Sequence, residues 1–150
     1  MGSKRSTASP RVSVEPELAA HAVAAASDAI VTLDQAAKVT SWNQAAEDLF
    51  GFSRQQALEQ GLALIIPAEY RARHVAGFHA AMDSGHLAHG GRVARVEALT
   101  ASGDLLVLGL SLGLIPGEDG TPAGVVAVLR PTSPPAVEFV PAPVSLKPPS

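Results

Sequence analysis

Short apolar stretches, each bounded by polar or turn-forming residues, occur at five places along the chain. Two lie early, and the turn-forming residues QAAK that separate them predict a hairpin. Three lie late, separated by the turn-rich linkers TASG and PGEDGTP. The pattern therefore predicts five strands, at residues 28–34 (DAIVTLD), 38–42 (KVTSW), 92–99 (RVARVEAL), 104–115 (DLLVLGLSLGLI) and 123–130 (AGVVAVLR).

The region between the two groups of strands is typical of short helices. Asn43 and Ser53 are residues that cap helix starts, and Gly51 is a residue that ends them. An alanine-rich stretch after Pro16 predicts one more helix before the first strand. The predicted helices are residues 17–26, 44–50 (QAAEDLF), 54–60 (RQQALEQ) and, after Pro67, a helix containing RARHVAGFHAAM at 71–82.

This order of elements predicts an α+β fold, with a five-stranded antiparallel sheet, short helices on one face and an N-terminal flanking helix. The folded domain is expected over residues 17–131. Residues 1–16 are small and polar, and the last twenty residues contain seven of the twelve prolines. We therefore expect residues 1–16 and the Pro-rich tail at 132–150 to be disordered.

Composition narrows the classes of function. A chain of 150 residues with 47% hydrophobic and 17% charged residues suits one domain with a real core. The net charge of −3 argues against a nucleic-acid partner. Absence of cysteine excludes disulfides, thiolate nucleophiles and Cys-based metal sites, and fits a cytoplasmic protein. No apolar run approaches the roughly 18 residues that span a membrane, and no secretory signal is expected.

The stretch SWNQAAEDLFGFSRQQALEQG resembles the PAS domain family. That family has a strand ending in asparagine, a helix with paired alanines, and then a cluster of phenylalanine, glycine, an aromatic residue and serine. The matching positions here are Trp42, Asn43, Ala45, Ala46, Leu49, Phe50, Gly51, Phe52 and Ser53. The resemblance extends over about residues 20–131 and implies a sensory or signalling module.

A second stretch, YRARHVAGFHAAMDSGHLAHGGRV, is similar to the haem-binding PAS domains of FixL-type oxygen sensors. That resemblance implies haem b, with His74 as the proximal iron ligand and Arg92, after Gly91, as the residue that contacts bound oxygen. His86 falls on a second histidine of that family, and Leu87, Leu110 and Leu112 fall on its distal apolar residues. Phe78, His79 and Ala80 stand where that family has an arginine that contacts a haem propionate.

The residues themselves leave His74 open to several interpretations. Phe78 and Met82 are four and eight residues further along the helix, so the three share one apolar face. A core histidine with one hydrogen bond fits this face, and so does a neutral imidazole that binds haem iron in an apolar pocket. The same pocket could hold an apolar metabolite. Arg92, by its position, is either a surface charge or a donor to a bound diatomic gas.

Two other sequence patterns give weaker evidence for a functional site. His86 and His89 have an HxxH spacing, but they lie in a glycine-rich loop without the further ligands that zinc needs. Residues 109–113, GLSLG, match the G-x-S-x-G expression of hydrolases, but they lie inside one alternating apolar run without the required turn. We expect no enzyme activity.

Together these observations predict a sensory module, most concretely a haem-based gas sensor with His74 as its metal ligand. The alternatives are a haem-free PAS module for interaction and dimerisation, or an apolar metabolite binder. The residues of the pocket would be His74, Phe78, Met82, His86, Leu87, Arg92, Leu110 and Leu112. A homodimer through the N-terminal helix and a separate output protein are the expected partners, with a diatomic gas if haem binds.

Overall fold

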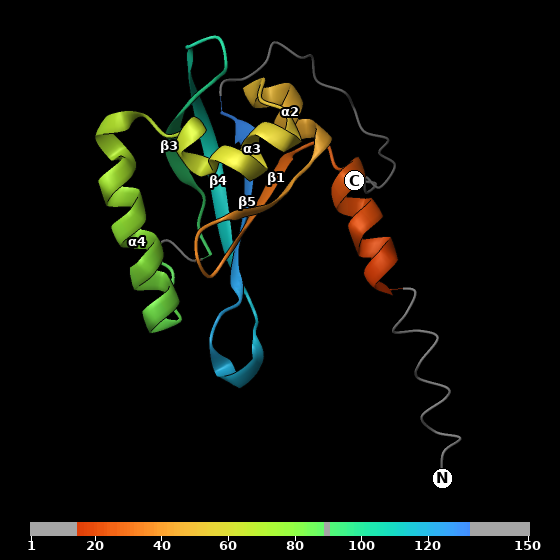
Figure 1. Cartoon of the computed structure of the whole chain (residues 1–150), viewed down its shortest axis with the longest axis vertical. Helices are drawn as coiled ribbons and strands as arrows, with labels where there is room; N and C mark the ends of the chain where they lie inside the picture. The colour runs from red at the N-terminus through yellow and green to blue at the C-terminus, as the bar shows by residue number, and fades with distance from the viewer. Residues whose placement is uncertain (1–14, 89–90, 133–150) are drawn as a thin grey trace, which may run out of the picture.

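The computed structural model describes residues 15–88 and 91–132, and it confirms the predicted α+β fold. The five strands form one antiparallel sheet in the order β2-β1-β5-β4-β3 (Figure 1). The elements are the N-terminal helix (residues 15–25), β1 (Ala29–Asp34), β2 (Val39–Trp42), α2 (Gln44–Phe50), α3 (Arg54–Gln60), η1 (Leu62–Leu64), η2 (Ala68–Tyr70), α4 (Arg71–Ser84), β3 (Ala94–Leu99), β4 (Leu105–Ile115), η3 (Glu118–Gly120) and β5 (Gly124–Pro131).

Several predicted boundaries differ from the observed ones. The N-terminal helix includes residues 15 and 16, two positions earlier than predicted, because a proline is tolerated in the first turn of a helix. Strand β3 begins at Ala94 and not at Arg92, because the chain is still turning at Gly91, whose φ is 79°. Residues 1–14 and 133–150, the larger part of the predicted disordered ends, lie outside the described residues.

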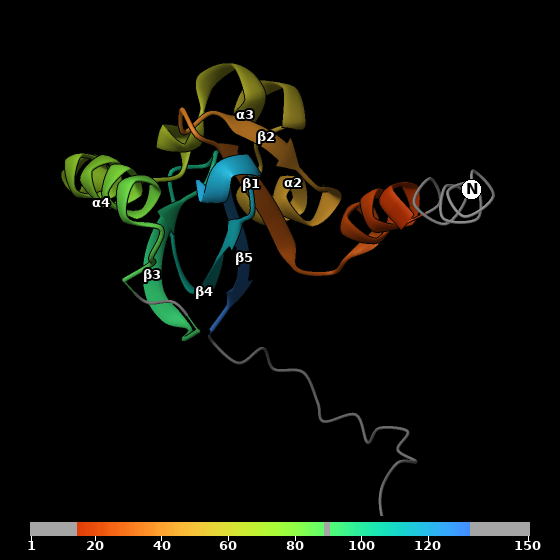
Figure 2. The ribbon, with the colours of Figure 1, turned by 90° about the horizontal axis from the view of Figure 1, so that it is seen from below.

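Side chains divide the sheet into two faces because successive residues point in opposite directions. The inner face carries apolar residues only. In the rows across the sheet, Leu110 is paired with Ala94 and with Leu129, and Leu112 is paired with Ala127. The inner face consists of Ala29, Val31 and Leu33 on β1, Ala94, Val96 and Ala98 on β3, Leu106, Leu108, Leu110, Leu112 and Leu114 on β4, and Val125, Ala127 and Leu129 on β5. Helices α2, α3 and α4 lie on one side of the sheet, and α4 runs beside β3 (Figures 1 and 2).

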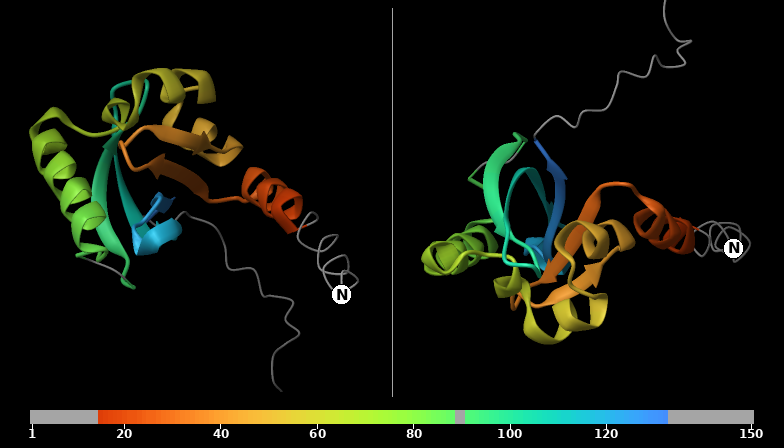
Figure 3. Two further views of the ribbon diagram at one scale, coloured as in Figure 1. Left: turned by 60° about the horizontal axis from the view of Figure 1, so that its bottom comes forward. Right: turned by 90° about the horizontal axis from the view of Figure 1, so that it is seen from above.

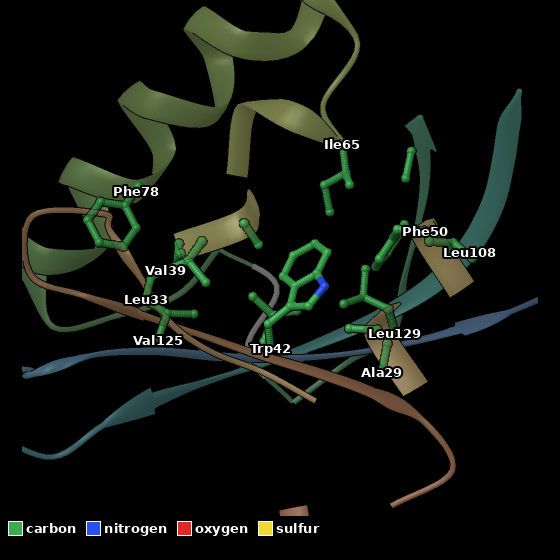
Figure 4. Packing of buried hydrophobic residues seen from close by; sticks show 14 residues of the cluster. Ala29, Leu33, Val39, Trp42, Phe50, Ile65, Phe78, Leu108, Val125 and Leu129 are labelled. Atoms are coloured by element: carbon green, nitrogen blue, oxygen red, sulfur yellow. The ribbon is translucent and has the colours of Figure 1, made fainter. Parts of the chain in front are cut away.

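The core lies between the inner face and these helices. Its centre is the pair Trp42 and Phe50, whose ring centroids are 5.5 Å apart. Trp42 is buried and donates its indole N–H to the Phe52 carbonyl at 3.0 Å, so its polar atom is satisfied. Figure 4 shows Trp42 and Phe50 in the middle of the cluster and Phe78, from α4, at one end of it near Leu33.

Asn43 joins three segments at one point. It is buried, and its Oδ1 accepts the backbone N–H of Ala46, which caps α2 as predicted, and that of Ile30 on β1. Its Nδ2 donates to the carbonyls of Val23, at 2.9 Å, and Asp28, at 3.1 Å. All its hydrogen-bonding positions are therefore used, and the end of the N-terminal helix is fixed to the start of α2 and to β1.

Candidate ligand site

Helix α4 supplies one wall of the candidate site. Its start is set by Pro67 and the 3-10 turn η2, and it ends at Gly85, which has the left-handed φ of 75° and donates its N–H to Ala81. Phe78 and Ala81 are buried and Met82 is half-buried. Because these positions recur every three or four residues, only one side of the helix faces the core.

His74 lies on this same side of α4 and is half-buried. Burial lowers the pKa of its imidazole below the usual value of 6.5, and burial is the single cause of the shift. The imidazole is therefore neutral at neutral pH. A neutral imidazole on an apolar wall can pack, accept or donate one hydrogen bond, or offer a ring-nitrogen lone pair to a metal.

The other wall of the candidate site is the inner face of β4, whose leucines pack against the same core cluster as Phe78 and Met82. Leu110 and Leu112 both lie on it, as their alternation with Gly109 and Ser111 predicts. Both leucines pack against the core cluster but remain half-buried, as does the neighbouring Ala127. Leucine side chains that point inward yet keep some exposure show that the helices do not cover this part of the inner face completely.

The remaining predicted site residues lie at the end of α4 and before β3. His86 and Arg92 are exposed, and Leu87 is half-buried. Arg92 stands in a bend two residues before β3, so the expectation that it starts a strand is wrong. The structure thus brings His74, Phe78 and Met82 together on one side of α4, and Leu110 and Leu112 together on the inner face, but it leaves His86 and Arg92 at the surface.

Metal chemistry at this site would depend on His74. Within residues 15–88 and 91–132, no group of three or more His, Cys, Asp or Glu side chains is placed to hold a metal ion. His89, half of the HxxH spacing, lies outside the described residues. A haem iron, held by four ring nitrogens of its own, needs only one protein imidazole, and the half-buried His74 among apolar side chains fits that requirement.

A second feature, which no sequence pattern indicated, is a shallow open depression at the far end of the sheet. It is formed by the turn after β1 and the loop between β4 and β5, where Gln35 donates to the Pro122 carbonyl at 2.8 Å. The residues that line it are Asp34, Gln35, Ala36, Gly117, Glu118, Asp119, Thr121 and Ala123. His74 is not among them, so this depression is separate from the candidate ligand site.

Comparisons with known proteins agree with the fold. Over 81 residues the chain is 37% identical to an uncharacterised protein of Azorhizobium caulinodans. The matched region is 52% of this chain but only 11% of that protein. Among solved structures, a PAS domain from Colwellia psychrerythraea superposes with a TM-score of 0.65 at 22% identity, covering 77% of this chain and 94% of that one. A PAS domain of a two-component sensor histidine kinase superposes with a TM-score of 0.61 at 15% identity, covering 80% of this chain and 98% of that one.

A third solved structure, an RNA-binding light-oxygen-voltage receptor, superposes with a TM-score of 0.62 at 17% identity, over 79% of this chain and 33% of the receptor. At such identities these likenesses show the fold alone. In the part of the chain that the structure describes, no helix is both long and apolar enough to cross a bilayer. The family model for the PAS fold matches residues 17–132, most of the chain, and the chain therefore belongs to the PAS family of sensory and signalling domains.

Proposed function

We propose that this PAS domain is a sensory binding module, not an enzyme, with its input site between α4 and the inner face of the sheet. The observation that carries the proposal is the half-buried, neutral His74 on the apolar side of α4. It is a single polar group on a wall shared with Phe78 and Met82. A mostly apolar site with one polar group is the usual chemistry of small-molecule recognition.

The most concrete occupant is haem b, which the resemblance to FixL-type sensors suggests. His74 would hold the iron, and the haem, when bound, would supply a site for a diatomic gas. Phe78, Met82, Leu110 and Leu112 would keep water away from its faces. Arg92 would serve as a charge-assisted donor to the gas only after the segment before β3 moves inward, because the side chain is exposed in this structure.

A signal from this site has a short route to the N-terminal helix. Leu110 is paired with Leu129 across the sheet, and the next residue, Arg130, forms an ion pair with Asp28 at 2.5 Å. The Asp28 carbonyl accepts from Asn43, which also holds the Val23 carbonyl at the end of that helix. A shift of β4 or β5 would therefore reach the helix through contacts between adjacent residues. We propose that the helix passes the signal on by contact with another chain, a second copy or a separate output protein.

A specific observation favours a second candidate, a haem-free interaction module. Phe78, in the middle of the candidate wall, is only 7% exposed and already belongs to the core cluster. A side chain packed in this way fills space that a ligand would need. In that case His74 is a packing residue, and the domain acts only through its surfaces.

The test is a haem titration of the full chain, followed by its Soret absorbance. We expect uptake of one haem per chain, its loss in His74→Ala, and full retention in His79→Ala, a matched control because His79 is exposed on the same helix. Arg92→Ala should keep the haem and bind oxygen more weakly. Absence of stoichiometric uptake by the natural sequence, or equal uptake by His74→Ala, would overturn the gas-sensor proposal.

The same protein then separates the remaining alternatives. A thermal-shift screen with small apolar organic compounds should raise the melting temperature if the site takes a metabolite, and His74→Ala should reduce that response. A screen without any response, together with no haem uptake, leaves the interaction module as the function.

A further inference from the structure

Strand β3 forms one edge of the sheet, and most of this edge is open. Figures 2 and 3 show it as the outermost strand on its side of the sheet. Its pairing with β4 runs without a break from Ala94 to Leu99, and the strand contains no proline. An edge of this kind is a template on which another strand can pair, and natural proteins usually shorten, bend or cover such edges.

The opposite edge of the sheet is protected in these ways. Strand β2 has only four residues, and a shift in register interrupts its pairing with β1. Its last residue, Trp42, is buried and donates to the Phe52 carbonyl, which holds the segment before α3 against the strand. Of the two edges, β3 is therefore the one that can accept a further strand.

Main-chain groups of β3 point away from β4 at every second residue. The Leu99 N–H donates outward, to the Ile65 carbonyl at 2.8 Å, and this bond closes the far end of the edge. Arg95 and Glu97 have the same orientation, because it alternates along an antiparallel strand. Across residues 15–88 and 91–132, no main-chain group bonds their outward N–H and C=O groups, and both residues are exposed.

The two charged side chains of β3 also lack a partner of opposite charge. Arg95 and Glu97 lie on the outer face of the sheet, the face away from the core, because Val96 between them lies on the inner face. The one ion pair in the described part of the chain involves neither of them. The Tyr70 hydroxyl donates to one carboxylate oxygen of Glu97 at 3.5 Å, and the other oxygen can still accept from an arginine.

The sequence of β3 is charge-inverted about its centre. Residues 94–98 read ARVEA, so positions equally far from Val96 hold two alanines, or an arginine and a glutamate. When two such strands lie antiparallel about a two-fold axis at Val96, Arg95 of each copy stands opposite Glu97 of the other. A two-fold axis at Arg95 or at Glu97 would instead set like charges opposite each other, which destabilises a strand pair.

We infer that β3 binds the β3 strand of a second copy, antiparallel and about a two-fold axis at Val96, so that one sheet continues through both copies. Arg95 and Glu97 would exchange main-chain hydrogen bonds with the same residues of the other copy, and their side chains would form symmetric ion pairs on the outer face. This interaction surface goes beyond the proposed function and does not depend on what the input site holds.

Both faces of the joined sheet match in this arrangement. On the inner face, the Val96 side chains of the two copies are half-buried in each chain and would cover each other at the axis. On the outer face, each arginine meets a glutamate. A strand of an unrelated protein could also satisfy the main-chain groups, but the inverted charges favour a second copy over such a strand.

The first experiment measures the association of the full chain by sedimentation over a range of protein concentrations. We expect a weak dimer, because one pair of strand edges buries less than the roughly 1,600 Å² of a standard interface. Arg95→Glu and Glu97→Arg should each weaken it at least ten-fold, since each sets like charges opposite each other. An equimolar mixture of these two variants should associate as a heterodimer, and the double variant Arg95→Glu/Glu97→Arg should dimerise like the natural chain.

The double variant keeps the net charge of the natural chain, so its recovery separates strand pairing from an effect of total charge. Val75→Glu is the control for an added carboxylate elsewhere, because Val75 is 52% exposed on α4, and it should leave the dimer unchanged. Circular dichroism checks that each variant is folded. A natural chain that stays monomeric at high concentration, or a failure of both the mixture and the double variant to associate, would overturn the inference.

The second experiment uses cysteine, which the natural sequence lacks. Val96→Cys by itself should give a disulfide-linked dimer under mild oxidation, because facing residues at the axis have Cα atoms about 4.5 Å apart. Val93→Cys is the matched control. Val93 is 71% exposed, more than Val96, but the register places it about 20 Å from its own copy. Cross-linking of Val93→Cys that is as fast as that of Val96→Cys contradicts the proposed register.

Leu18→Glu separates this inference from the proposed role of the N-terminal helix, on which Leu18 is 64% exposed. A dimer that survives Leu18→Glu and is weakened by Arg95→Glu supports pairing through β3, whatever the helix binds. If Leu18→Glu removes the dimer and Arg95→Glu leaves it intact, the copies are joined by the helix, and the inference about β3 is wrong.

Discussion

Helices α2 and α4 lie on the same side of the sheet, yet a larger share of α2 than of α4 is buried in the core. Helix α2 has seven residues, is capped at its start by Asn43, and buries Phe50 and Ala46 completely. Helix α4 has 14 residues, twice as many, but only Phe78 and Ala81 are buried, and its first residue has no side-chain cap. The shorter helix is therefore anchored more firmly in the core, and we expect the longer one to shift at a smaller cost in free energy. A sensory site needs a wall that can shift in this way, because elements that respond to ligands come from the less stable parts of a structure.

The largest expected difference between the two helices is in their phenylalanines. Phe50→Ala should lower the free energy of unfolding by about 4 kcal/mol, because Phe50 is 0% exposed and rigid neighbours surround the cavity that remains. Phe78→Ala should cost about 3 kcal/mol, because we expect α4 to shift toward the sheet and fill part of the space. Urea denaturation of both variants gives the two values. Equal losses would show that α4 is as firmly packed as α2, and the comparison would fail.

The next largest effect tests the start of α2. Asn43→Ala should cost about 3 kcal/mol, because it leaves the N–H groups of Ile30 and Ala46 and the carbonyls of Val23 and Asp28 without their partner. Gln44→Ala is the control, since Gln44 is exposed and bonds only Asp48 on the surface; it should cost less than about 0.5 kcal/mol. Hydrogen exchange should also quicken in the N-terminal helix of Asn43→Ala. An unchanged stability would mean that water takes over the hydrogen bonds of the Asn43 side-chain amide at no cost in free energy.

The ends of the two helices allow a matched comparison. Gly51 and Gly85 both have left-handed φ values, 82° and 75°, so alanine at either position is strained by about 1 kcal/mol. A Cβ at Gly51 would also lie 3.1 Å from Ala101 Cβ, whereas nothing lies within 4 Å of one at Gly85. Gly51→Ala should therefore cost roughly 2 kcal/mol and Gly85→Ala about 1 kcal/mol in thermal or urea unfolding. The reverse order would indicate that the contact between α2 and the turn before β4 is loose.

The sequence predicts the structure around α2 more fully than the structure around α4. The residues around α2 have local signals that act within a few positions: Asn43 caps the helix, Gly51 ends it, and Ser53 caps α3 while its own backbone N–H donates to the Gln56 side chain. The succession of strands and helices along the chain was also predicted, and so was the inner face of β4, since alternation fixes which of its leucines share one face. The order of the strands within the sheet was not predicted. The family resemblance rested on these same residues, which is why the fold was predictable.

The candidate ligand site was less predictable because it depends on distances between elements. Spacing places His74, Phe78 and Met82 on one side of α4, and the structure agrees. Spacing does not say how far α4 stands from β4, nor that the chain is still turning at Arg92. Of the four side-chain bonds of Asn43, only the cap on α2 was predicted, because its other partners, Ile30, Val23 and Asp28, are distant in sequence and are brought to it by tertiary packing. What a pocket holds is set by such distances, and no local pattern encodes them.

The smallest expected effect concerns His74 and the dependence of stability on pH. Its pKa is lowered in the folded protein by burial, so between that lowered pKa and the ordinary value of 6.5 the unfolded chain binds more protons than the folded one. Stability should therefore be constant near pH 8 and fall as the pH drops below about 6.5. In His74→Gln this part of the loss should disappear, whereas His79→Gln should keep it, because His79 is exposed on the outward side of the same helix. Urea midpoints at pH 8 and pH 5.5 for the three proteins measure the difference. If the loss at pH 5.5 is the same in all three, the His74 imidazole is effectively solvated, and α4 stands open enough for water to reach the wall on which the proposed site depends.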